Sequence, residues 1–497
     1  MIHEQGSSER AVRVLIVGSG FAGINAAIMP RARGIWEFVI LERGTSLGGT
    51  WRDNRYPGCA CDVESVLYSY SFAPNPDWSR TFAGSAEIAR YLQRVATEYE
   101  VGPHIRYGEE VTDARWDEEA QRWLVHSTSG AWAAEHLIVA TGALSDPVRP
   151  AIPGLDSFAG PCFHTADWDE GIALEGKRVA IIGTGASAIQ VIPAIQPKVR
   201  ELKVVQRTPA WVIPRHDRAI PAWRRTLYAK VPLTQRLARG LQYLRHEILF
   251  VPFRHRWARR IAQGILGRHL ARQVRDPQLR ARLTPRYDIG CKRLLLSDDY
   301  YPAMSQPNVT LVDQAVTQVT PTGFVTADGT AHEVDVLLLA TGFRPTDPPL
   351  APHIRGREGR SLGEIWAGSP TAYLGTTVAG FPNLALLNGP NTGLGHSSVL
   401  MMFEAQCEHL NGLFDLLALS GAQTAEPTAE AQARYVARID AGHRNTVWQR
   451  GGCQSWYLDR TGRNSTLWPY GVGRFRQTVT QVVPADYRLA GLAEHRD

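Results

Sequence analysis

The segment VRVLIVGSGFAGINAA, residues 12–27, decides the fold. Its β-branched run leads into Gly18, Gly20 and Gly23, spaced as GxGxxG, and an alanine-rich stretch follows. The first glycine permits a tight turn, the second lets a pyrophosphate approach the backbone, and the third lets a helix pack against the strand. The segment therefore predicts a strand, a turn and a helix whose N-terminus faces the phosphates of a dinucleotide.

Glu42 belongs to the same predicted unit because it ends a second apolar run, 24 residues after Gly18. An acid at that distance accepts hydrogen bonds from a ribose 2′-hydroxyl. The stretch LGGTW, residues 47–51, follows closely, and its glycines let backbone approach the phosphates and the ring of a flavin. The first dinucleotide is therefore expected to be FAD. Its expected contacts in this stretch are Gly49, Thr50 and Trp51.

A second unit repeats the plan, since an apolar run at 178–182 leads into GTGASA, residues 183–188, which fits GxGxxA. Its expected cofactor contacts are Gly183, Gly185 and Ser187. Arg207 lies 24 residues after the first of these glycines, where the first unit has its acid. A cation there, with the Thr208 hydroxyl beside it, pairs with a 2′-phosphate, which favours NADPH over NADH. A solvated surface arginine is the alternative.

Two strand endings share the sequence Ala-Thr-Gly, and they add Thr141, Gly142, Thr341 and Gly342 to the expected cofactor-binding residues. Each follows an apolar run. Taken alone, a strand ending in Thr-Gly is a common way to place a glycine in a left-handed conformation. Together with two glycine turns, the pair supports a protein built on two dinucleotide sites.

This arrangement resembles the class B flavoprotein monooxygenases, which include the Baeyer-Villiger enzymes and the N- and S-oxygenating enzymes, and the resemblance covers nearly the whole chain. In that family the Ala-Thr-Gly segments join the nucleotide domains. The Baeyer-Villiger fingerprint FxGxxxHxxxW, followed by Pro or Asp, is met by Phe158, Gly160, His164, Trp168 and Asp169. Trp168 favours the Baeyer-Villiger branch, because the relatives usually carry Tyr there. We expect His164 to tether backbone rather than to act as a catalytic base.

The resemblance implies that NADPH reduces FAD, that O2 then forms a C4a-peroxyflavin, and that this peroxide converts a ketone into an ester or lactone, with sulfoxidation as a side reaction. Arg293 matches the active-site arginine of the family, whose fixed charge stabilises the developing oxyanion. Asp62 matches the aspartate that orients this arginine, and Lys292 matches the second cation near the 2′-phosphate. For Arg293 the alternative is an ordinary ion pair at a domain interface.

The stretch after LGGTW departs from many Baeyer-Villiger enzymes, since Arg52-Asp53-Asn54 stands where they carry an aromatic pair before Asn. This variant resembles the acetophenone-monooxygenase-like subgroup. The resemblance implies a preference for linear or aryl ketones. Two other functions stay open: an N- or S-oxygenating flavin-containing monooxygenase, and a flavin-binding protein that is not a monooxygenase. An NADPH-dependent disulfide reductase shares the plan of two nucleotide sites, but it needs a redox CxxC pair, which the sequence lacks.

Residues 215–286 differ from the rest of the chain in charge, with 17 arginines and Lys230 against three acids. The stretch is expected to be a helical insertion. It is interpreted as a solvated subdomain that gates substrate entry, as an amphipathic surface that meets an anionic membrane, or as a nucleic-acid patch. The first interpretation is preferred, and no nucleic-acid partner is expected because no known motif for one accompanies the charge.

The predicted fold is α/β, with two Rossmann-like domains that bind FAD and NADPH and a helical insertion. The expected limits are 1–150 and 346–497 for the two parts of the FAD domain, 151–214 and 287–345 for the two parts of the NADPH domain, and 215–286 for the insertion. Both nucleotide domains are expected to contain mainly parallel sheets.

Composition excludes other classes for a chain of 497 residues with 44% hydrophobic residues and a net charge of +6. It is neither disordered nor fibrous. No apolar run is long enough for a membrane span and the first ten residues do not resemble a signal peptide, so a soluble, cytoplasmic protein is expected. The six cysteines contain no CxxC pair, so no metal site and no dithiol centre are expected, and Cys59 and Cys61 are predicted to be buried thiols.

Overall fold

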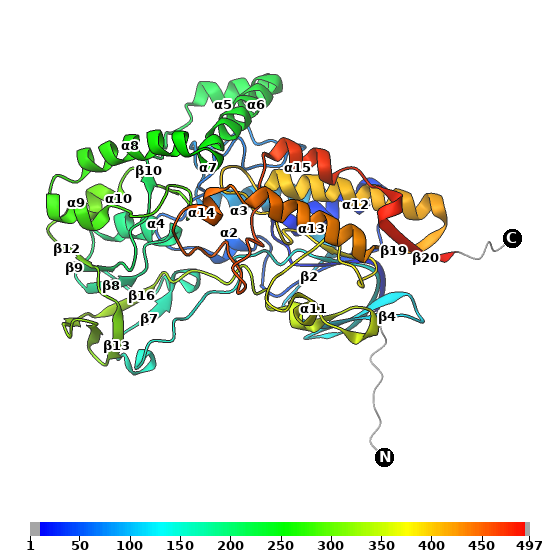
Figure 1. Cartoon of the computed structure of the whole chain (residues 1–497), viewed down its shortest axis with the longest axis horizontal. Helices are drawn as coiled ribbons and strands as arrows, with labels where there is room; N and C mark the ends of the chain where they lie inside the picture. The colour runs from blue at the N-terminus through cyan, green and yellow to red at the C-terminus, as the bar shows by residue number, and fades with distance from the viewer. Residues whose placement is uncertain (1–9, 493–497) are drawn as a thin grey trace, which may run out of the picture.

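Two sheets form the frame of the computed structural model, which describes residues 10–492 (Figure 1). The larger sheet has the order β17-β4-β5-β6-β1-β2-β3, and β18 also pairs with β6. Its strands are β1 (Arg10–Val17), β2 (Phe38–Glu42), β3 (Ile105–Tyr107), β4 (Val111–Asp117), β5 (Arg122–Ser127), β6 (Gly130–Val139), β17 (Ile354–Arg355) and β18 (Leu384–Leu386). The strands from β18 and β6 to β3 are parallel, whereas β4 and β5 form antiparallel pairs.

The smaller sheet has the order β12-β9-β8-β16-β7, and all its pairs are parallel. Its strands are β7 (Cys162–His164), β8 (Arg178–Ile182), β9 (Glu201–Val205), β12 (Val309–Val312) and β16 (Val336–Leu339). An antiparallel sheet of β13 (Val316–Thr320), β14 (Gly323–Thr326) and β15 (Ala331–Glu333) accompanies it. The central strands are buried on both faces and are accordingly almost entirely apolar.

Helices cover both sheets, and each glycine turn opens one of them. Gly20 caps α1 and Gly185 caps α4, so the backbone N–H groups of both helix starts follow directly on a strand. The helices outside the insertion are α1 (Phe21–Ala32), α2 (Thr50–Asp53), α3 (Ser85–Glu98), α4 (Ala186–Ile195), α10 (Tyr300–Met304), α11 (Leu362–Trp366), α12 (Leu400–Ser420), α13 (Ala429–His443), α14 (Val447–Arg450) and α15 (Val472–Val479). Strand β19 (Ala422–Pro427) follows α12 and pairs antiparallel with β20 (Tyr487–Leu492), the last element of the described chain, in a separate two-stranded sheet.

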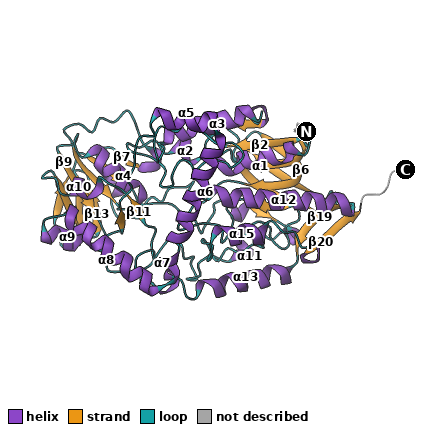
Figure 2. Ribbon diagram, turned by 90° about the horizontal axis from the view of Figure 1, so that it is seen from above, coloured by secondary structure: helices purple, strands orange, loops and turns teal. Residues whose placement is uncertain are grey.

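The insertion is helical, as predicted. It contains α5 (Ala222–Lys230), α6 (Pro232–Leu249), α7 (Val251–Arg254), α8 (Arg256–Gln273) and α9 (Pro277–Leu283). The short strands β10 (Val212–Ile213) and β11 (Leu295–Leu296) pair in parallel and bring its two ends together. In the view from above, α6 and α7 run between the parts that contain the two sheets (Figure 2). Within residues 10–492, every helix is too short or too polar to cross a bilayer.

The chain order is nested, because the chain leaves the larger sheet after β6, builds the smaller sheet, and returns to add β17 and β18 to the larger one. This arrangement confirms the predicted α/β fold class. The antiparallel β4-β5 hairpin is the part of the larger sheet that departs from a purely parallel plan. The predicted domain limits at 150, 214, 286 and 345 lie in connections between these elements and remain predictions.

Candidate active site

The first glycine turn packs against the end of strand β6, which explains why a glycine stands at residue 18. Gly18 has φ +99°, and a Cβ on it would lie 2.8 Å from the Ala140 carbonyl oxygen. A Cβ on Gly23 would lie 1.8 Å from the Gly18 oxygen, so the helix approaches the turn as closely as the motif requires. The Cα atoms of Gly20 and Gly49 also meet, since a Cβ on Gly49 would lie 3.2 Å from the Gly20 Cα. The two predicted backbone contacts for FAD are thus adjacent.

Strand β16 repeats this arrangement in the smaller sheet. Gly183 has φ +113°, and a Cβ on it would lie 2.3 Å from the Ala340 oxygen. A Cβ on Gly185, in contrast, would meet nothing within 4 Å, and the N-terminus of α4 there is exposed. Ser187 lies in the first turn of the same helix. The backbone is therefore open where the phosphates of a second dinucleotide are predicted to lie.

The Ala-Thr-Gly segments end the strands on which the two glycine turns pack. Gly142 and Gly342 are left-handed, with φ +74° and +83°, as the sequence predicts. Thr341 donates a hydrogen bond from its hydroxyl to the Val148 carbonyl, and the Val148 N–H donates to Gly342. Thr141 lies beside the first turn, with its Cα 3.5 Å from a Cβ built on Gly18. The connections between the two sheets therefore run side by side.

Glu42 ends β2, and its carboxylate is already engaged by protein groups. It accepts hydrogen bonds from Ser19 N at 2.9 Å and Ser19 Oγ at 2.7 Å, from Gly44 N at 2.7 Å and from Arg52 Nη1 at 2.7 Å. Burial raises the pKa of Glu42, but these hydrogen bonds lower it by more, so the carboxyl stays ionised below its ordinary range. Arg52 also holds Asp53 through two hydrogen bonds. This pairing of Arg52 with the predicted ribose acceptor is not among the contacts expected from the sequence.

Thr50 and Trp51 form the start of α2, beside the first glycine turn. Thr50 is exposed, whereas Trp51 donates from its indole to the Tyr68 hydroxyl at 3.1 Å. Trp51 packs against the apolar cores of both sheet-containing parts. It is thus placed to hold the two parts together beside the predicted FAD site.

Arg293 and Asp62 meet although 231 residues separate them in the sequence. Arg293 donates from Nε at 2.9 Å and from Nη2 at 2.6 Å to Asp62 Oδ2, and from Nη1 to the Leu394 carbonyl at 3.4 Å. The two side chains are 28% and 29% exposed, so the pair is partly open to a ligand. The Asp62 carboxylate raises the pKa of Arg293 above its ordinary value, which makes the guanidinium a permanent charge. Burial raises the pKa of nearby Tyr457 to about 12, although Arg293 opposes this.

Lys292 and Arg207 form a cationic pair, as the sequence predicts for a 2′-phosphate site. Burial and then the charge of Arg207 lower the pKa of Lys292. Lys292 lies over the Tyr287 ring, 5.2 Å from its centroid, and the Thr208 carbonyl accepts a hydrogen bond from Thr184. Among the described residues, neither Lys292 nor Arg207 has a carboxylate partner in an ion pair. Two neighbouring cations that repel each other favour binding of an anion.

The fingerprint lies along the edge of the smaller sheet, on β7 and the segments around it. His164 pairs in register with Leu339, and its Nδ1 accepts the Ala166 N–H at 3.0 Å. Burial lowers the pKa of His164, and its ring lies 5.7 Å from that of Phe343, directly after the second Ala-Thr-Gly segment. A neutral, buried ring that accepts a backbone N–H fits a tether better than a base.

The other fingerprint residues hold this edge in place. A Cβ on Gly160 would lie 2.4 Å from the Asp335 oxygen, so only glycine fits there. Phe158 packs against the core beneath the sheet, Trp168 contacts Phe163 edge to face at 5.3 Å, and Asp169 accepts the Gly171 N–H at 2.8 Å. These contacts hold the fingerprint segment against the edge of the smaller sheet.

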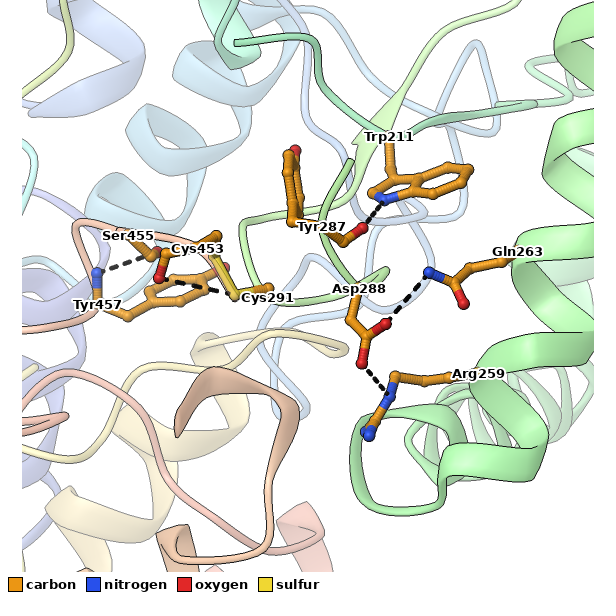
Figure 3. The surroundings of a disulfide bond; sticks show 9 residues. All are labelled: Trp211, Arg259, Gln263, Tyr287, Asp288, Cys291, Cys453, Ser455 and Tyr457. Carbon is orange, nitrogen blue, oxygen red and sulfur yellow. Dashed lines mark hydrogen bonds and ion pairs between the residues drawn. A yellow bond between two sulfur atoms is a disulfide. The ribbon is translucent and has the colours of Figure 1, made fainter. Parts of the chain in front are cut away.

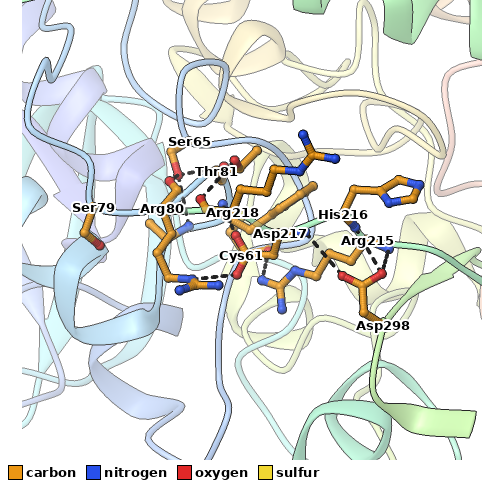
Figure 4. A network of polar contacts seen from close by, with 12 residues as sticks. Cys61, Ser65, Ser79, Arg80, Thr81, Arg215, His216, Asp217, Arg218 and Asp298 are labelled. Carbon is orange, nitrogen blue, oxygen red and sulfur yellow. Dashed lines mark hydrogen bonds and ion pairs between the residues drawn. The ribbon is translucent and has the colours of Figure 1, made fainter. Parts of the chain in front are cut away.

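A network of hydrogen bonds around Asp298 fixes the first residues of the insertion (Figure 4). Asp298 accepts the backbone N–H groups of Arg215 at 2.9 Å, His216 at 3.1 Å and Asp217 at 3.3 Å. Arg215 in turn donates to the Cys61 carbonyl at 2.9 Å, directly before Asp62. The segment that carries Asp62 is thus tied both to the insertion and to the segment that follows Arg293.

Two further contacts near the site were not predicted. Gln190 of α4 accepts a hydrogen bond from the Tyr56 hydroxyl at 3.1 Å and donates to the Ala60 carbonyl at 2.9 Å, which links the two sheet-containing parts. Its position as the polar residue of an apolar helix is a signal that sequence reasoning could have used. Cys291 and Cys453 form a disulfide 162 residues apart in the sequence, beside Tyr457 (Figure 3). Cys59 and Cys61 are buried free thiols, which confirms that prediction.

Comparison with known proteins gives consistent matches over the whole length. Residues 15–225 match the family model described as pyridine nucleotide-disulphide oxidoreductase. The chain is 48% identical to a Baeyer-Villiger monooxygenase of Streptomyces coelicolor, over 98% of this chain and 94% of that protein. It is 42% identical to a Baeyer-Villiger monooxygenase of Pseudomonas aeruginosa, over 97% and 92%. The crystal structure of OTEMO in complex with FAD and NADP superposes with a TM-score of 0.87 at 28% identity, over 97% of this chain and all of that one. The chain therefore belongs to the Baeyer-Villiger monooxygenases.

Proposed function

We propose that the protein binds FAD at its first glycine turn and NADPH at its second, and uses them with O2 to convert ketones into esters or lactones. Membership of the family supports this reaction. The single observation in the structure that carries it is the ion pair of Arg293 with Asp62. It joins the segment before the insertion to the segment after it, at the junction of the two nucleotide-binding parts.

The residues fit both cofactors. For FAD, the backbone of Gly18, Gly20 and Gly49 forms a cradle that side chains would fill. For NADPH, the backbone is open at Gly185, the N-cap of α4, where the phosphates would lie. Arg207 and Lys292 supply an unpaired positive charge for the 2′-phosphate. A related monooxygenase crystallised with both FAD and NADP supports the assignment.

When bound and reduced, FAD supplies the activation of O2 that no amino-acid side chain provides. The chain's own contribution is electrostatic. Arg293 keeps its charge at every working pH and offers a planar fork of N–H donors to the oxyanion that develops on the ketone carbonyl. Asp62 binds Nε and Nη2 and leaves most of the Nη1 donor capacity for the reacting oxygen. Tyr457 stays neutral because of its raised pKa and therefore does not cancel this charge.

The proposal also includes the class of substrate and the location of the protein in the cell. The resemblance of Arg52-Asp53-Asn54 to the acetophenone-monooxygenase-like subgroup supports linear or aryl ketones as preferred substrates. The same oxidant would convert thioethers to sulfoxides as a side reaction. A cytoplasmic location is supported by the need for NADPH, which cells regenerate there.

The test is a comparison of linear, cyclic and aryl ketones with amines and thioethers, using the FAD-loaded enzyme and NADPH in air. Product is identified by gas chromatography and mass spectrometry, and NADPH consumption is followed in parallel. The proposal predicts esters or lactones in proportion to the NADPH consumed. Oxidation of amines or thioethers without any ester would make the enzyme an N- or S-oxygenating monooxygenase instead. Consumption of NADPH with hydrogen peroxide as the sole product would contradict monooxygenation altogether.

A further inference from the structure

Three helices of the insertion expose large apolar side chains to an extent found nowhere else in residues 10–492. Of the 19 large hydrophobic residues that are exposed there, 12 lie between residues 223 and 265. They are Trp223, Leu227, Val231, Leu233, Leu237, Leu241, Leu244, Ile248, Leu249, Trp257, Ile261 and Ile265. We call the surface of α5, α6 and α8 that carries them the apolar face. Isolated exposed apolar residues are common on proteins, but a contiguous group of this size marks an interaction surface.

Helix α6 is amphipathic, but its apolar side faces solvent and its polar side faces the protein. Leu233, Leu237, Leu241, Leu244 and Ile248 recur at the spacing of one helical face, and they are 55–70% exposed. An amphipathic helix of a water-soluble protein turns such a face toward the core. Here the exposures show that the face points to solvent, and α5 and α6 project from the rest of the molecule (Figure 1).

The inward side of α6 is polar, and three of its side chains bind the body of the protein. Gln235 donates to the Asn75 carbonyl at 2.6 Å, and Arg239 donates to the Ser69 carbonyl at 2.9 Å. His246 contacts Glu64 Oε2 at 2.8 Å and the His396 carbonyl at 2.6 Å. Because these contacts fix the rotation of the helix, the leucine face cannot turn inward without breaking them. The exposure of the apolar face is therefore built into the fold.

Exposed apolar residues also lie on α5, which packs against α6, and on α8, which is joined to α6 through α7. Trp257, Ile261 and Ile265 repeat every four residues on α8, and Trp223 and Leu227 do so on α5. Tryptophan at such positions is typical of the boundary between water and a lipid bilayer, where its ring is half apolar and half polar.

Positive charge surrounds this face, and of the exposed basic residues described on its helices only Arg245 forms an ion pair, with Glu64 at 3.5 Å. Between Arg218 and Arg275 the only carboxylate is Glu247, which turns inward and accepts the Val472 N–H at 2.9 Å. The exposed basic side chains on these helices are Arg224, Lys230, Arg236, Arg245, Arg256, Arg260, Arg268 and Arg272. On α6, Arg236 and Arg245 flank the leucine stripe on opposite sides, as the helical spacing shows.

We propose that the apolar face of α5, α6 and α8 binds the surface of an anionic lipid bilayer, with its leucines and tryptophans among the acyl chains and its arginines at the headgroups. An apolar stripe bordered by basic residues is the pattern of a helix that lies in the membrane interface. A second copy of the chain fits less well, because a two-fold interface would bring each basic face against itself. Nucleic acid would match the charge but not the aliphatic stripe.

The experiment is sedimentation of the FAD-loaded enzyme with vesicles of phosphatidylcholine alone or mixed with phosphatidylglycerol. One variant carries Leu237→Ser, Leu241→Ser and Ile248→Ser, and a second carries Arg236→Gln, Arg256→Gln and Arg260→Gln. The matched control is Leu419→Ser, which removes an 88% exposed leucine outside the face. All these side chains are exposed, so flavin content and melting temperature are expected to stay at the wild-type values.

We expect the wild type and Leu419→Ser to bind vesicles that contain phosphatidylglycerol, and both triple variants to bind at least tenfold more weakly. Binding should also fall with added salt, since part of it is electrostatic. Equal binding of all four proteins would overturn the proposal, as would a wild type that binds no vesicle. A wild-type dimer that the leucine variant converts into a monomer, without vesicle binding, would assign the face to a second copy instead. None of these outcomes depends on the oxygenation reaction.

Discussion

At Arg293 the structure places a charge that no working pH removes, held by a carboxylate that binds one side of the guanidinium. Nη1 reaches the Leu394 carbonyl at 3.4 Å and is only weakly engaged there, and Tyr457 lies beside the guanidinium. A donor arranged in this way before the reaction costs no reorganisation when negative charge develops on a substrate oxygen. Two predictions follow at the scale of single side chains.

Replacing Arg293 by alanine should leave NADPH-dependent flavin reduction close to wild type and lower the rate of ester formation by about 100-fold or more, the usual effect of removing a donor to an oxyanion. Arg293→Lys should keep the charge but lose the planar set of N–H donors. Its rate of ester formation should therefore lie between those of the wild type and the alanine variant. The rates are measured by flavin absorbance under anaerobic conditions and by ester yield in air. An alanine variant with normal ester yield would show that the ion pair is only structural.

Replacing Arg207 by alanine should raise KM for NADPH roughly 10- to 100-fold, because a charge-assisted contact worth about 1.5–3 kcal/mol is lost. KM for NADH should hardly change, since that cofactor lacks the 2′-phosphate. Arg200→Ala is the matched control, because Arg200 is an exposed arginine at the other end of strand β9. If KM rose equally for both cofactors, Arg207 would have no role at the 2′-phosphate.

At the scale of elements, helix α6 depends on contacts that sequence periodicity does not reveal. The amphipathic pattern of a water-soluble helix usually turns its apolar side toward the core, whereas the structure buries Gln235 and His246 on the side opposite the leucines. The reason lies in Asn75 and Glu64, whose side-chain and backbone acceptors belong to a distant segment of the chain. The sequence of one helix alone does not show which of its faces will find hydrogen-bond partners elsewhere in the chain.

Glu64 provides a test of this attachment through pH. Burial raises the pKa of Glu64, but the hydrogen bond and charge of His246 lower it by more, so the net pKa lies below the ordinary 4.5. A carboxyl with a lowered folded-state pKa stabilises the protein above its unfolded pKa, and this contribution disappears as the pH falls through the folded value. Glu64→Gln should therefore have a lower melting temperature than wild type at pH 7. The difference should shrink as the pH falls below 4.5, and a difference that is constant with pH would contradict a stabilising role of the Glu64 carboxylate.

The disulfide between Cys291 and Cys453 ties the segment of Arg293 to the loop of Tyr457. Cross-linking so distant parts of the chain restricts the unfolded state, typically by about 2–4 kcal/mol. The double variant Cys291→Ser, Cys453→Ser should melt at a lower temperature than wild type, and reducing agent should lower only the wild-type value. Cys162→Ser, which changes a free thiol, is the control. A reduced wild type that melts as the oxidised one would show that the bond is absent or does not stabilise the fold.

At the scale of the whole molecule, some structural features could be predicted from the sequence and others could not. The glycine turns could be predicted because only glycine permits their φ angles and close contacts, so the sequence has no alternative at Gly18 or Gly183. The meeting of Arg293 with Asp62 was expected through the family resemblance, since no local pattern brings together residues 231 positions apart. The pairing of Arg52 with Glu42 and the disulfide depend on tertiary geometry alone, and neither was foreseen.

Nesting explains how the two nucleotide-binding parts act on one substrate. The chain crosses twice between the sheets, through segments that run side by side at Val148 and Gly342, and Gln190 and Trp51 bridge the same junction. Arg293 and Asp62 lie on segments that this junction brings together. The central claim is that this site inserts one atom of O2 into a ketone.

The most direct measurement is the reaction of the FAD-loaded enzyme with NADPH, an aryl ketone and ¹⁸O2, with the product analysed by mass spectrometry. The account predicts an ester that contains one labelled oxygen, formed by the wild type and nearly absent with Arg293→Ala. A labelled ester formed equally by both proteins would refute the role of Arg293, and the absence of labelled ester from the wild type across a panel of ketones would contradict the proposed function itself.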